Sequence, residues 1–274
     1  MKHQMSSHLL VALLVLGESQ AQTIWTQRTA GSRLTIEYMQ PTFANTISWL
    51  TTSGSIVTLN GKVQVGSSVG VIVEVPYVSG TISTSFPFAS SAGSVSEKKG
   101  GNVYVGLEIG NFESNIFLEI GARPFATETS SSSGIIPMVG AIGDFDRQEA
   151  YLEKMSSYQA ALNLTSTQTQ GFVYRVRVGP TIFVPKTTGS ESITLMDYGL
   201  KMGYDNGQLG LLGGISGRWN TKIKSGKAAY HHLALDLGYR FGKIRPAFFY
   251  RMPLDKEMTD IVARTIGANI TVAL

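Results

Sequence analysis

The stretch from Tyr230 to Pro253 alternates strictly between large apolar side chains and polar or small ones. Successive residues of a β-strand point to opposite faces, so this alternation predicts strands with one apolar face. Gly242-Lys243 divides the stretch into two arms, and a two-residue link that contains glycine predicts a β-hairpin. The first arm places Leu233, Leu235, Leu237, Tyr239 and Phe241 on one face, and Ala234, Asp236, Gly238 and Arg240 on the other.

Two kinds of all-β protein are compatible with this alternation. A soluble barrel or sandwich turns its large apolar side chains inward, whereas a transmembrane barrel turns them toward lipid and keeps a polar lumen. The period of two residues is the same in both, so the rest of the chain must distinguish them.

Comparable alternation recurs along the chain in about twelve segments of roughly 10 residues, the length that a tilted strand needs to cross a bilayer. The links between these segments are alternately long and short. Transmembrane barrels have short periplasmic turns and longer outer loops, so this order predicts such a barrel with both termini on the periplasmic side. The short links are 66–68, 111–113, 169–171, 205–207 and 242–243, and the long ones are 44–54, 79–101, 124–157, 186–192, 220–227 and 254–264.

Charged residues recur on the polar face of these predicted strands. They cannot share a dry core, because each buried charge costs several kcal/mol unless it is paired and hydrogen-bonded. A wet lumen removes this cost, and we therefore expect residues 32–274 to form an antiparallel outer-membrane β-barrel of about twelve strands. The predicted lumen-facing rows contain Glu37, Glu74, Glu108, Glu119, Arg123, Arg175, Arg177, Asp197, Lys201, Arg218, Asp236, Arg240, Arg245 and Arg251.

The first residues resemble an export signal. Leu9 to Gly17 is a short apolar run, and Ser19 and Ala21 are small residues at the −3 and −1 positions before Gln22. This pattern predicts a cleaved signal peptide over residues 1–21, followed by a short linker over residues 22–31. The 274-residue chain has no cysteine, which excludes disulfides, thiolate metal sites and a cysteine nucleophile. Its net charge of +4 is not gathered into a run, so we expect no nucleic-acid partner.

Three short stretches carry a resemblance to a known family. They are Val73-Glu74-Val75-Pro76-Tyr77, the segment from Gly101 to Leu107 (GNVYVGL), and the segment from Ile244 to Asp255 (IRPAFFYRMPLD). With these stretches the chain resembles the FadL-like outer-membrane β-barrel transporters, in particular the shorter branch labelled meta-pathway of phenol degradation outer-membrane proteins. The resemblance implies passage of small molecules, hydrophobic or aromatic ones among them, across the outer membrane.

The longest link, from Pro124 to Ser157, contains apolar residues that an outer loop does not require: Ile135, Ile136, Met138, Val139 and Phe145. Residues 144–155 are also compatible with a short helix capped by Asp144. The link either folds into the mouth of the barrel and constricts it, or forms an ordinary outer loop that faces lipopolysaccharide and solvent. The sequence leaves these two interpretations equally open.

The predicted lumen rows divide along the chain, since the acidic residues Glu37 to Glu119 precede the arginines Arg175 to Arg251. In a closed barrel the two sets can face one another across the lumen. They would then either create a transverse field that orients polar solutes, or form a salt-bridged plug in a narrow lumen.

No arrangement of residues indicates an enzyme. His231 and His232 are adjacent in a predicted strand, so they point to opposite faces and do not share a metal ion. They are followed by Leu233 and Ala234, without the serine that a lipid-cleaving triad needs nearby. We expect no catalytic residues, no metal and no cofactor.

These observations predict a bacterial outer-membrane barrel that passes small molecules whose identity the sequence does not reveal. The expected partners are outer-membrane lipids, lipopolysaccharide and the barrel-assembly machinery. A non-transporting structural or adhesive barrel is the first alternative, and a barrel enzyme that acts on lipid is the second.

Overall fold

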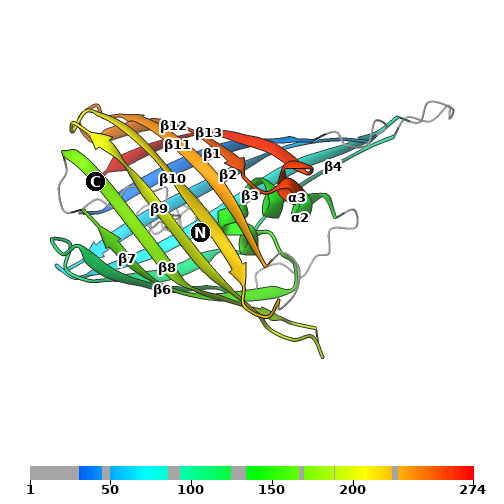
Figure 1. Cartoon of the computed structure of the whole chain (residues 1–274), viewed down its shortest axis with the longest axis horizontal. Coiled ribbons are helices and arrows are strands. Elements are labelled where there is room, and N and C mark those ends of the chain that lie inside the picture. Colours follow the sequence, from blue (N-terminus) through cyan, green and yellow to red (C-terminus); the bar gives the residue numbers. More distant parts are fainter. Residues whose placement is uncertain are drawn as a thin grey trace, which may run out of the picture.

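The computed structural model describes residues 31–44, 50–85, 93–124, 134–166, 170–187, 189–223 and 228–274. Thirteen described strands form one antiparallel sheet that closes on itself, because β2 pairs with β1 on one side and with β3 on the other (Figure 1). Its strands are β1 (Arg33–Phe43), β2 (Leu50–Val65), β3 (Val69–Thr84), β4 (Gly93–Gly100), β5 (Tyr104–Ile109), β6 (Ile116–Arg123), β7 (Met155–Thr165), β8 (Gly171–Pro185), β9 (Ile193–Asp205), β10 (Leu209–Asn220), β11 (Ala229–Tyr239), β12 (Ile244–Pro253) and β13 (Val262–Ala273).

The wall of the barrel has twelve strand positions, because β4 and β5 pair with successive parts of the same strand. Tyr77 to Thr84 of β3 pair with β4, and Val69 to Glu74 pair with β5. The first and last strands close the ring, with Arg33 opposite Ala273. The twelve-stranded antiparallel barrel predicted from the sequence is therefore confirmed, with one additional strand.

The outward and inward faces differ as the alternation predicts. Ile36, Leu211 and Phe248 are 53%, 58% and 66% exposed on the outside. Glu74 and Lys62 have the opposite parity in their strands, and both side chains are completely buried in the interior. An apolar outer wall around a charged interior is the arrangement expected of a barrel whose surrounding solvent is hydrocarbon.

Short turns gather at one end of the barrel and long connections at the other (Figure 1). We call these ends the turn side and the loop side. Gly66 and Gly242 have positive φ values of 69° and 60° in two of the turns, a conformation that glycine adopts without steric cost. In the part of the chain that the structure describes, no helix is both long and apolar enough to cross a membrane.

Several boundaries differ from the prediction. Residues 50–54 were expected in a loop but extend β2, and residues 79–101 contain the end of β3 and all of β4. These segments are rich in serine and threonine and lack the apolar alternation on which the prediction relied. They form a three-stranded extension of the wall, which projects beyond the loop side (Figure 1).

The predicted signal peptide and all of the predicted linker except Gly31 lie outside the described residues. Smaller differences concern the long links 124–157 and 254–264. Strand β7 begins at Met155 and ends at Thr165, three residues earlier than the predicted strand at each end. The link before β13 contains the short helix α3 (Lys256–Thr259), and β13 begins at Val262.

Candidate functional site

The segment from Gly134 to Lys154, which we call the inner segment, enters the barrel from the loop side (Figure 1). It consists of α2 (Ile135–Pro137), the π-helical turn η1 (Met138–Ile142) and the 3-10 helix η2 (Phe145–Ala150). A helix was predicted to begin at residue 144 with Asp144 as its cap. Asp144 does precede η2, but its side chain makes no capping hydrogen bond, because its carboxylate is turned toward arginines instead.

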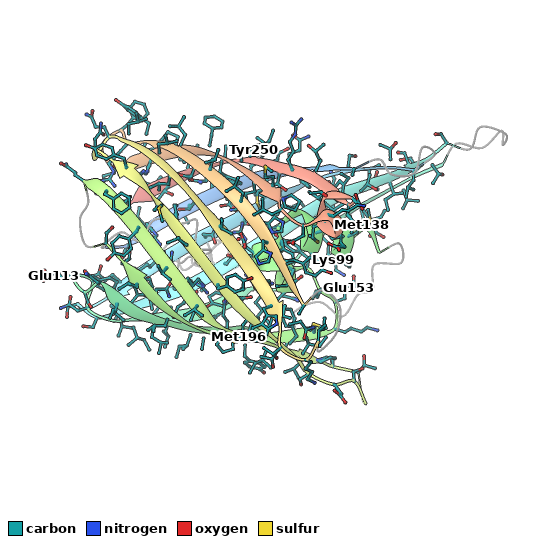
Figure 2. All side chains as sticks on the ribbon, in the orientation of Figure 1. Lys99, Glu113, Met138, Glu153, Met196 and Tyr250 are labelled. Atoms are coloured by element: carbon teal, nitrogen blue, oxygen red, sulfur yellow. The ribbon has the colours of Figure 1, made fainter. Side chains whose placement is uncertain are left out.

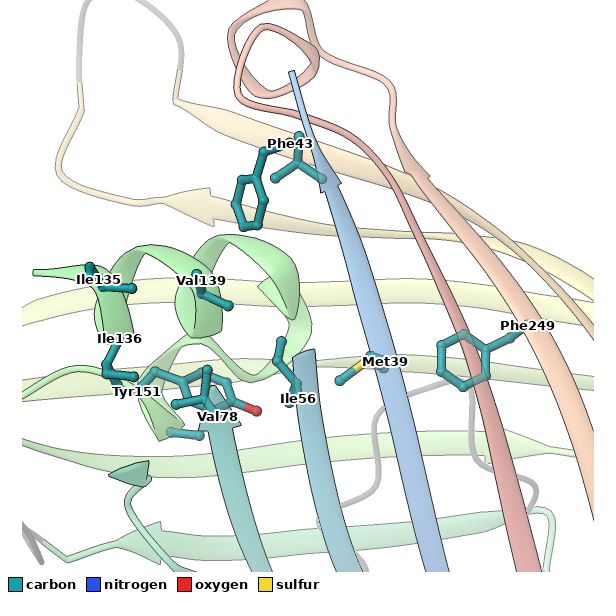
Figure 3. Close-up of a cluster of buried hydrophobic side chains, with 11 residues drawn as sticks. Met39, Phe43, Ile56, Val78, Ile135, Ile136, Val139, Tyr151 and Phe249 are labelled. Atoms are coloured by element: carbon teal, nitrogen blue, oxygen red, sulfur yellow. The ribbon is translucent and has the colours of Figure 1, made fainter. Parts of the chain in front are cut away.

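Apolar contacts hold the first half of the inner segment against the wall. Ile135, Ile136 and Val139 are almost completely buried and form one cluster with side chains of β1, β2 and β3 (Figure 3). The wall makes room for them with glycine, since a Cβ atom at Gly80 would lie 2.6 Å from Cγ2 of Ile135. The wall residues of this cluster include Met39, Phe43, Ile56, Val78, Phe249 and Val262.

A buried guanidinium anchors the second half. Arg147 is 3% exposed and forms ion pairs with Glu37 of β1, with Glu74 of β3 at 3.5 Å, and with Asp144 of its own segment at 2.5 Å. Asp144 also pairs with Arg251 of β12, whose Nη1 lies 3.2 Å from Oδ1. One buried cluster thus joins the inner segment to three strands of the wall.

Glu149 and Asp146 reach the opposite side of the lumen. Oε2 of Glu149 lies 2.8 Å from Nη1 of Arg218 on β10, and Oε1 lies 3.6 Å from Nε of Arg123 on β6. Ser216 of β10 donates a hydrogen bond of 2.9 Å to Asp146. The inner segment is therefore fastened to β1, β3, β6, β10 and β12, which together span the lumen.

The gap between β4 and β5 is also closed by the inner segment. The side-chain amide of Asn102, which lies between these strands, donates hydrogen bonds to the carbonyl oxygens of Glu149 and Leu152 at 3.1 and 2.8 Å. Arg123 donates to the carbonyl oxygen of Asn102 at 2.9 Å. The segment thus completes the wall at the point where the strand is interrupted.

Burial and the neighbouring arginines together shift the pKa values of two carboxyl groups of the segment in opposite directions. Burial raises the pKa of Asp144 to about 6, against the opposing effect of Arg147 and Arg251. Burial also acts to raise the pKa of Glu149, but Arg218 and Arg123 outweigh it and hold that pKa below its usual range. The two carboxyl groups therefore respond to acid at different pH values.

Aromatic contacts place Phe145 against the far wall. Its ring centre lies 4.8 Å from that of His232 and 6.3 Å from that of Tyr230, both on β11. The guanidinium of Arg218 lies over the same ring at 5.7 Å. Of the apolar residues singled out in this link, Ile135, Ile136 and Val139 are buried, whereas Met138 and Phe145 are half-buried.

Pairs between wall residues occupy the turn-side half of the interior. Lys62 pairs with Glu108 at 2.9 Å, Arg177 with Glu119 at 2.7 Å, and Arg245 with Asp205 at 2.8 Å. Arg175 donates a hydrogen bond of 2.7 Å to the side-chain oxygen of Asn163.

Most of the predicted lumen residues are buried in this interior. Asp236, Arg240 and Arg245 are half-buried, and Arg240 lies one residue beyond the end of β11. The sequence did not predict that Asp144, Arg147 and Glu149 lie in the lumen, although all three charged residues follow the apolar stretch of this long link.

The two histidines of β11 have different surroundings. His232 points inward, where it contacts Phe145. Nε2 of His231 lies 2.7 Å from the hydroxyl of Tyr198, and its Nδ1 lies 3.2 Å from Asp255. Among the described residues, no group of three or more His, Asp or Glu side chains is arranged to hold a metal ion.

Solved structures with a similar fold come from bacterial outer-membrane proteins. An outer membrane channel from Pseudomonas putida F1 matches with a TM-score of 0.59 at 12% identity, over 94% of this chain and 100% of that chain. The translocator domain of the autotransporter NalP from Neisseria meningitidis matches with a TM-score of 0.54 at 11% identity, over 99% and 95% of the two chains. The transport unit of the autotransporter AIDA-I from Escherichia coli matches with a TM-score of 0.51 at 11% identity, over 96% of each chain.

Neither a family model nor a curated protein sequence matches this chain. The fold and its charged interior define the class: the protein has the architecture of a bacterial outer-membrane β-barrel. At these low identities the likeness concerns the fold, and the function of the chain must be argued from its own residues.

Proposed function

We propose that this protein is an outer-membrane pore for small solutes in which the inner segment acts as a constriction. The observation that carries the proposal is the position of Arg147. It is buried within the lumen, on a segment that belongs to no wall strand, and it pairs with Glu37 and Glu74 from the wall. A purely structural barrel gains little from placing a connecting loop in its own interior, whereas a pore gains a means to limit its width.

The charged lining favours polar solutes. Inward-facing side chains of the turn-side half include Lys62, Glu108, Glu119, Arg175 and Arg177, all buried in the interior. A hydrophobic or aromatic solute, which the family resemblance implies, would displace water from charged side chains along this path without forming hydrogen bonds in its place. We therefore favour small hydrophilic solutes, and transport of a hydrophobic compound is the competing outcome.

Single-channel conductance in a planar bilayer tests the constriction. We expect the refolded protein to show small or rare conductance steps, and a variant that lacks residues 135–149, with Arg147 and Glu149 among them, to show larger and frequent ones. Equal conductance of the two proteins would contradict the proposal. Heat-modifiable migration on a gel confirms that each protein has formed a barrel before its conductance is compared.

A reversible crosslink supplies a matched control. The natural chain has no cysteine, so Gly80→Cys and Ile135→Cys introduce one defined pair, at positions close enough for a disulfide. Val139→Ala accompanies them in all compared proteins, because a Cβ atom at position 80 would lie 2.8 Å from Cγ2 of Val139. We expect the oxidised protein to keep its small conductance under conditions that open the unmodified protein. Addition of a reductant should restore opening, which separates movement of the inner segment from a general effect of the substitutions.

The alternative of a structural or adhesive barrel receives support from one feature, the projecting extension formed by β2, β3 and β4. It predicts that neither the natural protein nor the deletion variant conducts. Hydrolysis of lipid by the purified protein would instead identify an enzyme.

A further inference from the structure

The outward face of the barrel wall changes its chemistry where β2, β3 and β4 leave the barrel. Up to Val57 and Tyr77 this face carries apolar or aromatic side chains, as on the other strands. Beyond them it carries hydroxyl groups on all three strands. This part of the wall, which we call the hydroxyl face, contains Thr51 and Ser53 of β2, Thr81 and Ser83 of β3, and Ser94 and Ser96 of β4.

The strand register arranges these six residues in two rows. Thr81 lies opposite Ser53 on one side and Ser96 on the other, and Ser83 lies between Thr51 and Ser94 in the same way. Neighbouring Cβ atoms across an antiparallel sheet are about 5 Å apart, and the rows are separated by about 7 Å along the strands.

Hydrogen bonds fix the orientation of part of the hydroxyl face. The hydroxyl oxygens of Thr81 and Ser96 are 2.8 Å apart, and those of Ser83 and Ser94 are 3.2 Å apart. Each hydroxyl has one donor and two acceptor sites, so a pair that bonds internally keeps capacity for an external partner. The next position on β4 is the exposed Lys98, opposite Ser79.

The opposite face of the extension is already occupied. Gly54 and Gly80 lie against Val139 of the inner segment, and Ile82 packs on the apolar cluster that contains it. The extension therefore has one face turned to the protein and one face, the hydroxyl face, turned away from it.

From these observations we infer that the hydroxyl face docks the phosphorylated saccharide head groups of lipopolysaccharide. Continuity with the lipid-facing wall carries the argument, because the molecules that contact the hydroxyl face are those directly above the hydrocarbon around the barrel. Sugar hydroxyls exchange hydrogen bonds with serine and threonine, and Lys98 supplies a positive charge for phosphate.

The height of the face distinguishes a saccharide layer from phospholipid head groups. From Tyr77 to Thr84 the strand extends about 23 Å, or about 17 Å along the membrane normal at the usual strand tilt. A phospholipid head-group layer is only about 5–8 Å thick. Most of the hydroxyl face thus extends above such a layer, within the depth that the sugars of lipopolysaccharide occupy. The inference rests on an outer-membrane location and not on transport.

Hydrogen exchange in vesicles tests this docking. The full chain is placed in phosphatidylethanolamine–phosphatidylglycerol vesicles with or without lipopolysaccharide, and exchange is followed in residues 50–55, 79–84 and 93–99. We expect lipopolysaccharide to slow exchange of these amides about tenfold. Equal exchange in both vesicles would overturn the proposal, and equal protection by phospholipid alone would overturn the assignment to saccharide.

Two variants make the test specific. The first changes the hydroxyl face (Ser53→Ala, Thr81→Val, Ser96→Ala and Lys98→Gln), and the second changes the opposite face of the same strands (Thr52→Val and Thr84→Val). We expect protection by lipopolysaccharide to be lost in the first variant and kept in the second. Exchange in vesicles without lipopolysaccharide must match the natural protein, which shows that the extension still folds. Loss of protection in both variants would contradict a role of the hydroxyl face, and the conductance of the same samples tests the pore separately.

Discussion

The two halves of the barrel interior are built from the same inward rows of strand residues, yet they differ in what those rows contact. On the loop side, Glu37, Glu74 and Arg251 pair with charges of the inner segment. On the turn side, Lys62 and Arg177 pair with carboxylates of other wall strands. Figure 2 shows how side chains crowd around the inner segment at the loop side.

In the proposed pore, this difference assigns the turn-side pairs to the stability of the barrel and the loop-side pairs to the docking of the inner segment. Two charges on wall strands stay within reach of one another as long as the barrel is closed, because every strand is held by backbone hydrogen bonds on both sides. A pair between the wall and the inner segment can break while the barrel stays intact. Charges on the turn side therefore fix the lining, whereas charges on the loop side can control a removable obstruction.

The largest expected effect comes from Arg147→Ala. It removes the ion-pair partner of the buried Glu37, which costs about 3–5 kcal/mol of docking free energy. Glu74 and Asp144 also lose a cation, but they keep their pairs with Arg123 and Arg251. The inner segment should then leave the lumen, and conductance should rise toward that of the deletion variant. The matched variant Arg177→Ala breaks a buried pair on the turn side, so it should lower barrel stability without opening the mouth. A similar rise in conductance for both variants would remove the distinction between the two halves.

Acid provides the next largest effect. The pKa of Asp144 is raised from 3.8 in the free side chain to about 6, so the docked segment binds this proton more tightly than the released segment does. Docking of the inner segment is therefore strongest at pH values below 3.8, the pKa of the free aspartate side chain. The docking free energy weakens by on the order of 1–3 kcal/mol as pH rises through about 6. We expect open probability to increase between pH 5 and pH 7.

The variant Asp144→Asn should abolish this dependence, because its side chain does not titrate. Glu149 gives docking a pH dependence of the opposite sign. Because its pKa is lowered in the docked segment, its contribution to docking is lost as pH falls below the usual glutamate range. Renewed opening below about pH 4 is therefore expected in both proteins. An open probability that is higher at pH 5 than at pH 7 would contradict the role of Asp144.

A smaller effect is expected for Ile135→Val. It removes one methylene group from the completely buried apolar contact with β3, at a cost of about 0.5–1.5 kcal/mol. Open probability should rise slightly while the size of each conductance step stays the same. The same substitution at Ile36 on the exposed outer wall should leave gating unchanged. A change in step size would show that Ile135 shapes the open pore itself.

The smallest expected effect concerns ion selectivity. Arg245→Glu replaces the cation that pairs with Asp205 near the turn side and places two carboxylates together. We expect the ratio of anion to cation permeability to fall roughly twofold, measured as a reversal potential across a salt gradient in the deletion background. The exposed Lys222→Glu in an outer loop is the control and should have no effect. An unchanged ratio for Arg245→Glu would argue against a wet turn-side lumen.

The sequence determined the barrel, because alternation and link length depend only on neighbours along the chain. Strand β1 and strand β6 end where the predicted links 44–54 and 124–157 begin, and the inward direction of Glu74 or Arg177 follows from parity alone. The extension was missed for the same reason. Its serine and threonine residues lack an apolar face, and only pairing with β3 makes β4 a strand.

The tertiary structure decided what the charged rows contact. The sequence offered a transverse field or a salt-bridged plug, and it left the link from Pro124 to Ser157 as either a constriction or an outer loop. Arg147 lies 110 residues from Glu37 in the chain, and no local pattern specifies that distance. Pairs of this kind form because a buried charge must find a partner wherever the closed wall places one, which is a property of the whole barrel.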